Sequence, residues 1–152
     1  MVNRDFSDLF AALNGAGARY LLSGAHAVAF HAEPRYTKDL DVWVDATPTN
    51  ADRLMNALRE FGAPLGDVAA SDFAQPGITF QIGIAPNRID IATAIDGVTF
   101  DEAWERRVES TYGDHRIGVI GRDDLIANKT ASGRPQDVLD IGLLTKHGPS
   151  PT

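Results

Sequence analysis

Residues 38–45 read Lys-Asp-Leu-Asp-Val-Trp-Val-Asp, and this stretch decides how the rest of the chain is interpreted. Side chains of a β-strand alternate between its two faces, so the apolar members of the stretch share one face and enter a core. These members are Leu40, Val42 and Val44. Asp39 and Asp41 then lie side by side on the opposite face. Their charges repel each other unless a divalent cation sits between them, and oxygen-rich sites select hard ions such as magnesium or manganese.

The same pattern occurs once more, at residues 88–92, which read Arg-Ile-Asp-Ile-Ala. Ile89 and Ile91 are expected to face the core, and Asp90 the opposite side. If this strand lies beside the first one, three carboxylates converge on one patch, which suffices for a one- or two-metal phosphoryl-transfer site. Single aspartates at strand ends commonly cap turns or face water. Aspartate is nevertheless depleted in strands, so three together favour a site.

Outward from these segments, apolar residues follow helical and strand spacings in turn, which predicts an α/β (α+β) fold with a small mixed sheet flanked by helices. We expect a single domain over residues 1–147 and a disordered tail at residues 148–152. Helices are expected at residues 5–14, 24–31, 47–61, 100–106, 122–132 and 135–146. Strands are expected at residues 19–22, 40–44, 78–84, 88–92 and 116–120, with the third and fourth forming a hairpin.

Composition and charge narrow the function. The chain has 152 residues and a net charge of −7, whereas proteins that bind nucleic acid through a broad phosphate footprint are usually basic. It has no cysteine, which excludes disulfides and thiolate chemistry. The N-terminus lacks the apolar core of a signal peptide, and the most apolar stretch, residues 20–30, is too short to span a bilayer. We therefore expect a cytoplasmic protein with no membrane association.

A pair of small residues, Ser23-Gly24, follows an expected strand and begins an expected helix. Together with the acid–apolar–acid motif at Asp39 and Asp41 and the lone acid Asp90, this order resembles the DNA polymerase β-like nucleotidyltransferase superfamily. The likeness is closest to small bacterial members, including the toxins of abortive-infection toxin–antitoxin pairs. It continues more weakly through residues 128–140 and so covers nearly the whole chain. The family usually has glycine first in the small-residue pair, whereas serine comes first here.

The resemblance implies the chemistry of nucleotidyl transfer, in which a hydroxyl attacks the α-phosphate of a nucleoside triphosphate such as ATP and pyrophosphate leaves. Carried over residue by residue, the catalytic and metal-binding acids are Asp39, Asp41 and Asp90, with Mg²⁺ or Mn²⁺ as cofactor. The third acid helps to deprotonate the acceptor hydroxyl. The candidates for nucleotide binding are Ser23, Gly24, Arg35, Thr37 and Lys129. Gly24 lets the backbone approach phosphate at a helix start, where free N–H groups favour anions.

Several of these residues also have a structural explanation. Arg35 would otherwise form a salt bridge with the acidic pair, and Lys129 would be an exposed lysine on a helix. Asp137 is explained by the favourable interaction of an acid with the first turn of a helix. Trp43 either stacks on a base or, as we expect, packs against a neighbouring helix. The residues of the last helix expected in the core are Val138, Ile141 and Leu144.

The leading hypothesis is a metal-dependent, toxin-type nucleotidyltransferase whose acceptor is RNA, a protein hydroxyl or a small molecule. The alternative is a catalytically silent relative that binds a nucleotide or a protein partner in an antitoxin or scaffold role, and the Ser23-Gly24 order motivates it. The expected protein partner is an antitoxin or a second copy of the chain. A haloacid-dehalogenase-type phosphatase also uses an acid–x–acid motif, but its acids end an apolar strand, whereas here the apolar run follows Asp39.

Overall fold

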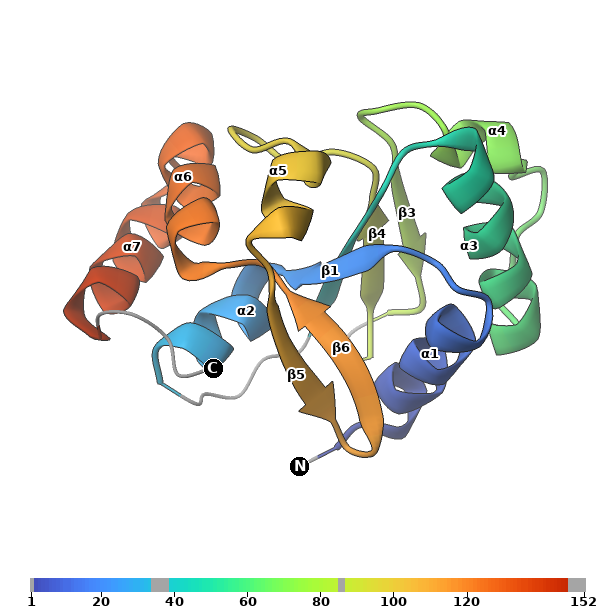
Figure 1. Cartoon of the computed structure of the whole chain (residues 1–152), viewed down its shortest axis with the longest axis horizontal. Helices are drawn as coiled ribbons and strands as arrows, with labels where there is room; N and C mark the ends of the chain where they lie inside the picture. The colour runs from blue at the N-terminus through green and yellow to red at the C-terminus, as the bar shows by residue number, and fades with distance from the viewer. Residues whose placement is uncertain (1, 34–38, 85–86, 148–152) are drawn as a thin grey trace.

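A six-stranded mixed β-sheet with flanking helices forms the fold, as the sequence predicts (Figure 1). The structure is a computed structural model that describes residues 2–33, 39–84 and 87–147, without the side chain of His147, so the expected tail lies outside the described residues. The strands are β1 (Tyr20–Ser23), β2 (Leu40–Val44), β3 (Thr79–Ile82), β4 (Ile89–Ala92), β5 (Val108–Tyr112) and β6 (His115–Val119). The helices are α1 (Arg4–Gly15), α2 (Gly24–His31), α3 (Pro48–Phe61), α4 (Ala70–Phe73), α5 (Phe100–Glu105), α6 (Arg122–Ser132) and α7 (Pro135–His147).

The order of the strands puts the acidic strand near the centre of the sheet. The strands run β3-β4-β2-β1-β6-β5 across it. The pairs β2–β4 and β1–β6 are parallel, and the other three pairs are antiparallel. In Figure 1, α1 and α3 lie together on one side of the molecule, and α6 and α7 lie on the other. β2 has a hydrogen-bonded neighbour on each side, so its position is fixed from both directions.

Local signals in the sequence account for the ends of the long helix α3. The Thr47 hydroxyl accepts a hydrogen bond from the backbone N–H of Asn50 at 3.2 Å, and Pro48 occupies the first turn. Gly62 ends the helix in the left-handed region, with a φ of 88°. Among the helices of the described residues, none is both long and apolar enough to cross a membrane.

The apolar residues of β2 enter the core as expected. Leu40, Val42 and Val44 are at most 1% exposed. Trp43 points to the opposite face and is also buried, because its ring packs edge-on against Phe100 of α5 with 5.1 Å between the ring centroids. This contact confirms that Trp43 packs against a neighbouring helix. α5 thus covers one part of the face that carries the acids, and the part around Asp41 remains half-buried.

Two short elements, β5 and α4, lie outside the sequence-based expectation. β5 pairs antiparallel with β6 across the two-residue turn Gly113-Asp114. Its side chains alternate between half-buried and exposed and include Glu109 and Ser110, so it lacks the apolar run that identifies a buried strand. The turn is the signal that could have identified it, since Gly113 takes a positive φ of 59°.

The prediction for the inward face of α7 is wrong at Val138. This residue is 61% exposed, whereas Leu144 is buried as expected. Asp137 and Asp140 lie on the inward face instead, 0% and 1% exposed. Buried carboxylates need partners, and both lie 3.2 Å from the Nζ of Lys129 on α6. Ion pairing with α6 therefore determines which side of α7 faces inward.

Candidate active site

Three neighbouring strands place polar residues from distant parts of the chain in one row. Ser23 of β1 lies opposite Asp41 of β2, and Asp41 lies opposite Asp90 of β4. Residues directly opposite each other on paired strands point to the same face of the sheet. Asp39 comes immediately before β2 and completes the set. We call Asp39, Asp41 and Asp90 the acidic site.

Gly24 is required by its contact with Asp41. Its φ is +65°, in the left-handed region that favours glycine, and a Cβ placed there would overlap the Asp41 carboxylate, lying 2.7 Å from its Cγ. The start of α2 thus packs directly against the carboxylate, and no side chain separates them. This packing against Asp41 explains the small-residue pair of the sequence without requiring a ligand.

Ser23 is buried, and its side chain does not cap α2. Its hydroxyl donates instead to the backbone carbonyl of Asp41 at 3.4 Å, a long hydrogen bond. The residue therefore joins the end of β1 to the start of β2. The backbone N–H groups at the start of α2 therefore donate no hydrogen bond to the Ser23 side chain.

Arg88 is the site residue that the sequence analysis did not identify. Its Nη2 lies 3.0 Å from Asp39 Oδ2 and 3.1 Å from Asp90 Oδ2. It pairs with two members of the acidic site at once. Strand alternation offered a signal, because Arg88 precedes Asp90 by two positions and so shares its face.

Burial and repulsion act together on Asp41. Burial has the largest effect and the neighbouring charges of Asp90 and Asp39 act in the same direction, and together they raise the pKa of Asp41 to about 6. Lys129 and Arg88 oppose the shift with smaller effects. The acidic site therefore holds more negative charge than its surroundings compensate, which is the condition in which a cation binds favourably.

The residues of the acidic site suit a divalent metal by their donor chemistry. All three are carboxylates, the donors that Mg²⁺ and Mn²⁺ prefer. Oδ1 of Asp39 is buried and has no hydrogen-bond partner within the part of the chain that the structure describes. In the described residues no group of three His, Asp or Glu side chains is placed to hold a metal ion. The three carboxylates supply the donor atoms that a divalent metal needs, and Arg88 pairs with two of them.

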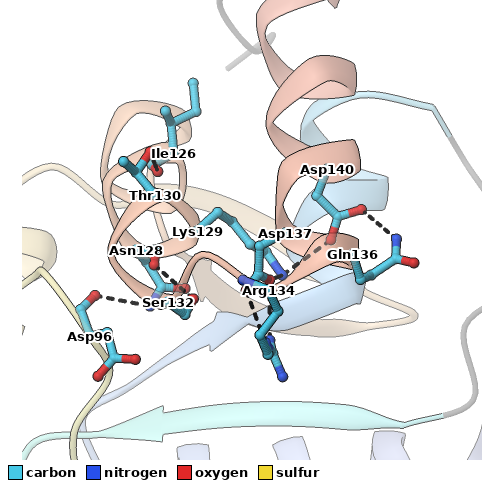
Figure 2. A network of polar contacts seen from close by, with 10 residues as sticks. All are labelled: Asp96, Ile126, Asn128, Lys129, Thr130, Ser132, Arg134, Gln136, Asp137 and Asp140. Carbon is cyan, nitrogen blue, oxygen red and sulfur yellow. Dashed lines mark hydrogen bonds and ion pairs between the residues drawn. The ribbon is translucent and has the colours of Figure 1, made fainter.

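A cavity of about 400 Å³ opens beside Asp41. It extends from the start of α2 to the loop after β4 and to α6. Its lining residues that carry polar side chains are Ser23, Asp41, Asp96, Asn128, Lys129, Ser132 and Arg134. Asn128 donates from Nδ2 to the backbone carbonyl of Asp96 at 3.0 Å, which ties α6 to the loop after β4 (Figure 2).

Lys129 lines this cavity but is not an exposed helical lysine. It is 6% exposed, and its ammonium contacts Asp137 and Asp140 on α7 (Figure 2). Arg134 adds a bidentate pair to Asp137, with Nε 2.9 Å from Oδ2 and Nη2 3.1 Å from Oδ1. We call Lys129, Arg134, Asp137 and Asp140 the buried network.

The buried network shifts the pKa of Asp137 in the opposite direction to that of Asp41. Hydrogen bonds from Arg134, and a further one from Lys129, hold the pKa of Asp137 well below its ordinary value despite burial. The interaction of Asp137 with the first turn of a helix is therefore secondary to these ion pairs. The Arg134 side chain remains 71% exposed at the mouth of the cavity.

Two sequence candidates, Arg35 and Thr37, lie outside the described residues. The others lie together: Ser23, Gly24 and Lys129 line the cavity beside Asp41. The structure also brings Arg134, Asn128 and Asp96 to this cavity.

Comparisons with known proteins add a family and a fold. The sequence model of one family, described as "Nucleotidyl transferase AbiEii toxin, Type IV TA system", matches residues 5–152. No curated protein matches the chain.

Two crystal structures share the fold at low sequence identity. The lincosamide antibiotic adenylyltransferase LnuA, lincomycin-bound, superposes with a TM-score of 0.59 and 15% identity, over 95% of this chain and 97% of that one. A proposed nucleotidyltransferase from Thermotoga maritima gives a TM-score of 0.59 and 13% identity, over 96% and 94% of the two chains. The likeness extends over nearly the full length of both structures.

Proposed function

The chain belongs to the AbiEii family of nucleotidyl transferase toxins, and we propose that it moves a nucleoside monophosphate from a nucleoside triphosphate to a hydroxyl acceptor. Membership of this family makes the protein a nucleotidyltransferase and argues against the catalytically silent alternative. The observation that carries the proposal is the register of β2 and β4, which sets Asp41 opposite Asp90 beside a helix start that presses on the Asp41 carboxylate.

We assign the divalent cation, Mg²⁺ or Mn²⁺, to Asp39, Asp41 and Asp90. A cation bound there would neutralise charge on the phosphates during transfer. In the proposed reaction Asp90 accepts the proton of the acceptor hydroxyl. The hydroxyl oxygen attacks the α-phosphorus, a new P–O bond forms, and the bond to pyrophosphate breaks.

The cavity of about 400 Å³ beside Asp41 is the proposed site of the nucleotide, with ATP as the donor. Ser23 and Gly24 stand at the start of α2, where backbone N–H groups and the helix dipole favour phosphate. Lys129 supplies positive charge from α6 on another wall of the cavity. Arg35 and Thr37 are assigned to nucleotide binding from their position just before Asp39.

We infer an antitoxin as the protein partner, because the matched family is described as the toxin of a type IV toxin–antitoxin system. The consumption of nucleoside triphosphates fits a cytoplasmic location. The acceptor hydroxyl belongs to an RNA, a protein or a small molecule, and these three are separable by the stability of the labelled product.

The test is transfer of label from each α-³²P nucleoside triphosphate, with Mg²⁺, to a bacterial extract depleted of free nucleotides. Asp41→Asn is expected to lower the rate about a thousandfold, a magnitude typical of losing a group that stabilises the transition state. Sensitivity of the product to ribonuclease or to protease identifies the acceptor, and resistance to both indicates a small molecule. Asp123→Asn, at a carboxylate that is 91% exposed, is the matched control and is expected to transfer at the wild-type rate. Equal rates for Asp41→Asn and the wild type would exclude the proposal.

A further inference from the structure

Arg88 pairs with Asp39 and Asp90, two of the three carboxylates that we assign to the metal. We propose that Arg88 is a built-in counter-ion of the acidic site, which neutralises Asp39 and Asp90 in the metal-free protein and leaves them when a divalent cation binds. The inference rests on the proposed function, because it takes Asp39 and Asp90 as metal ligands. It assigns to Arg88 control over the affinity for metal.

The contact geometry favours exchange of Arg88 for another cation. Both carboxylates are reached by the same nitrogen, Nη2. A guanidinium binds a carboxylate most strongly as a fork of two parallel hydrogen bonds, and no such fork joins Arg88 to Asp39 or Asp90. The Nε of Arg88 is buried and lacks a hydrogen-bond partner among residues 2–33, 39–84 and 87–147. An unsatisfied buried donor weakens the paired state relative to one in which the guanidinium reaches water.

Arg88 also has a route away from the acids. Its side chain is 37% exposed, so the guanidinium can turn toward solvent. Its backbone is held independently, because the Arg88 carbonyl accepts a hydrogen bond from the N–H of Leu40 at 2.9 Å. The side chain can therefore leave the carboxylates without disturbing the pairing of β2 with β4.

Arg88 and a divalent cation compete for the same negatively charged carboxylates. One guanidinium carries a single positive charge and, among the described residues, forms ion pairs with Asp39 and Asp90 but not with Asp41. A divalent cation brings twice that charge to the same carboxylates. While Arg88 is paired, Oδ2 of Asp39 and Oδ2 of Asp90 are engaged, so a cation that binds through these two atoms displaces Arg88 from them.

The experiment is calorimetric titration of nucleotide-free protein with Mn²⁺, in the wild type and in Arg88→Gln. Removing the competing charge is expected to tighten Mn²⁺ binding about tenfold, the change expected from loss of a modest charge-assisted contact. Arg88→Lys keeps the charge and is expected to stay within about threefold of the wild type. Arg19→Gln is the matched control: Arg19 is also 37% exposed and pairs with Asp45 after the other end of β2. Its affinity for Mn²⁺ is expected to be unchanged.

A second measurement follows the arginine in the wild-type protein. In ¹⁵N-labelled wild-type protein, Mg²⁺ is expected to shift the Nε resonance of Arg88, identified by its absence in Arg88→Lys, as the guanidinium leaves the acids. Equal or weaker Mn²⁺ binding in Arg88→Gln, with an unmoved Nε resonance, overturns the inference and leaves the proposed function standing. Absence of Mn²⁺ binding in both proteins overturns the metal assignment and the inference together.

Discussion

The acidic site and the buried network use the same kinds of residue and reach opposite electrostatic states. Asp137 is fully buried and Asp41 only half-buried, yet the pKa of Asp137 is lowered and that of Asp41 is raised to about 6. Partners explain the reversal, because Asp137 receives hydrogen bonds from Arg134 and Lys129. Burial is the largest cause of the raised pKa of Asp41, and Asp90 and Asp39 add to it. Burial alone therefore does not identify a functional carboxylate, whereas the sign of the charge on its neighbours does.

The largest expected effect comes from removing Lys129, the buried cation of the buried network. Lys129→Met leaves Asp137 and Asp140 buried without the ammonium, and we expect it to lower the free energy of unfolding by about 3–5 kcal/mol. Urea denaturation of this variant and of Lys146→Met, at an exposed lysine on α7, measures the difference. A cost below about 1 kcal/mol would mean that the network is no more important for stability than a surface ion pair.

Gly24→Ala tests how tightly the acidic site is packed. The added Cβ meets the Asp41 carboxylate at a φ of +65°, and we expect a loss of about 2–4 kcal/mol in unfolding free energy. Gly17→Ala is the control, because Gly17 has a φ of +70° but open space around its Cβ position, so it should lose only about 1 kcal/mol. Equal losses at the two glycines would show that the contact with Asp41 adds no strain.

Asp41→Asn is expected to stabilise the metal-free protein at pH 7.5, by about 1–2 kcal/mol after allowance for partial exposure. The sign follows from linkage: the pKa of Asp41 rises from 3.8 to about 6 on folding, so the folded state binds the proton more tightly. Wild-type stability therefore falls as pH rises from about 4 to about 6, whereas the variant lacks this loss. Denaturation of both proteins at pH 7.5 and pH 4 provides the comparison. A gain that persists undiminished at the lower pH contradicts the assignment to this carboxylate.

The smallest effect is expected on the outward face of α7. Val138→Ala should change the unfolding free energy by no more than about 0.5 kcal/mol, because Val138 is 61% exposed. Leu144→Ala, at a fully buried residue of the same helix, should cost about 2–4 kcal/mol. Thermal melts of the two variants check whether the buried network determines which face of α7 points inward. Comparable losses in the two variants would contradict this orientation.

The strands of the acidic site were predictable because alternation is a local property. Aspartates between apolar residues at 39–45 and at 88–92 indicated which side chains share a face, and β2 and β4 indeed pair in parallel. The partners of Arg88 were harder to predict, since the guanidinium reaches Asp39 only through the β2–β4 register, which no local pattern specifies. Arg35 and Thr37 remain predictions.

The last helix shows the limit of apolar spacing. Val138, Ile141 and Leu144 have helical periodicity, yet Val138 is exposed because Asp137 and Asp140 take the inward face. A sequence pattern that counts apolar residues treats these aspartates as outward-facing. Lys129 makes them inward-facing, and its own burial depends on them in turn. Such mutual dependence between two helices cannot be inferred from either helix alone.

The register of β2 and β4 has a consequence for biosynthesis. Asp41 and Asp90 are opposite each other only after the intervening α3, α4 and β3 have been made, and β4 ends at Ala92. Contacts between residues so far apart in sequence form late in folding, because a long loop must close first. A nascent chain that has not yet exposed Ala92 outside the ribosome therefore contains no assembled acidic site. Any activity that depends on the acidic site therefore begins only after β4 has been synthesised and has paired with β2.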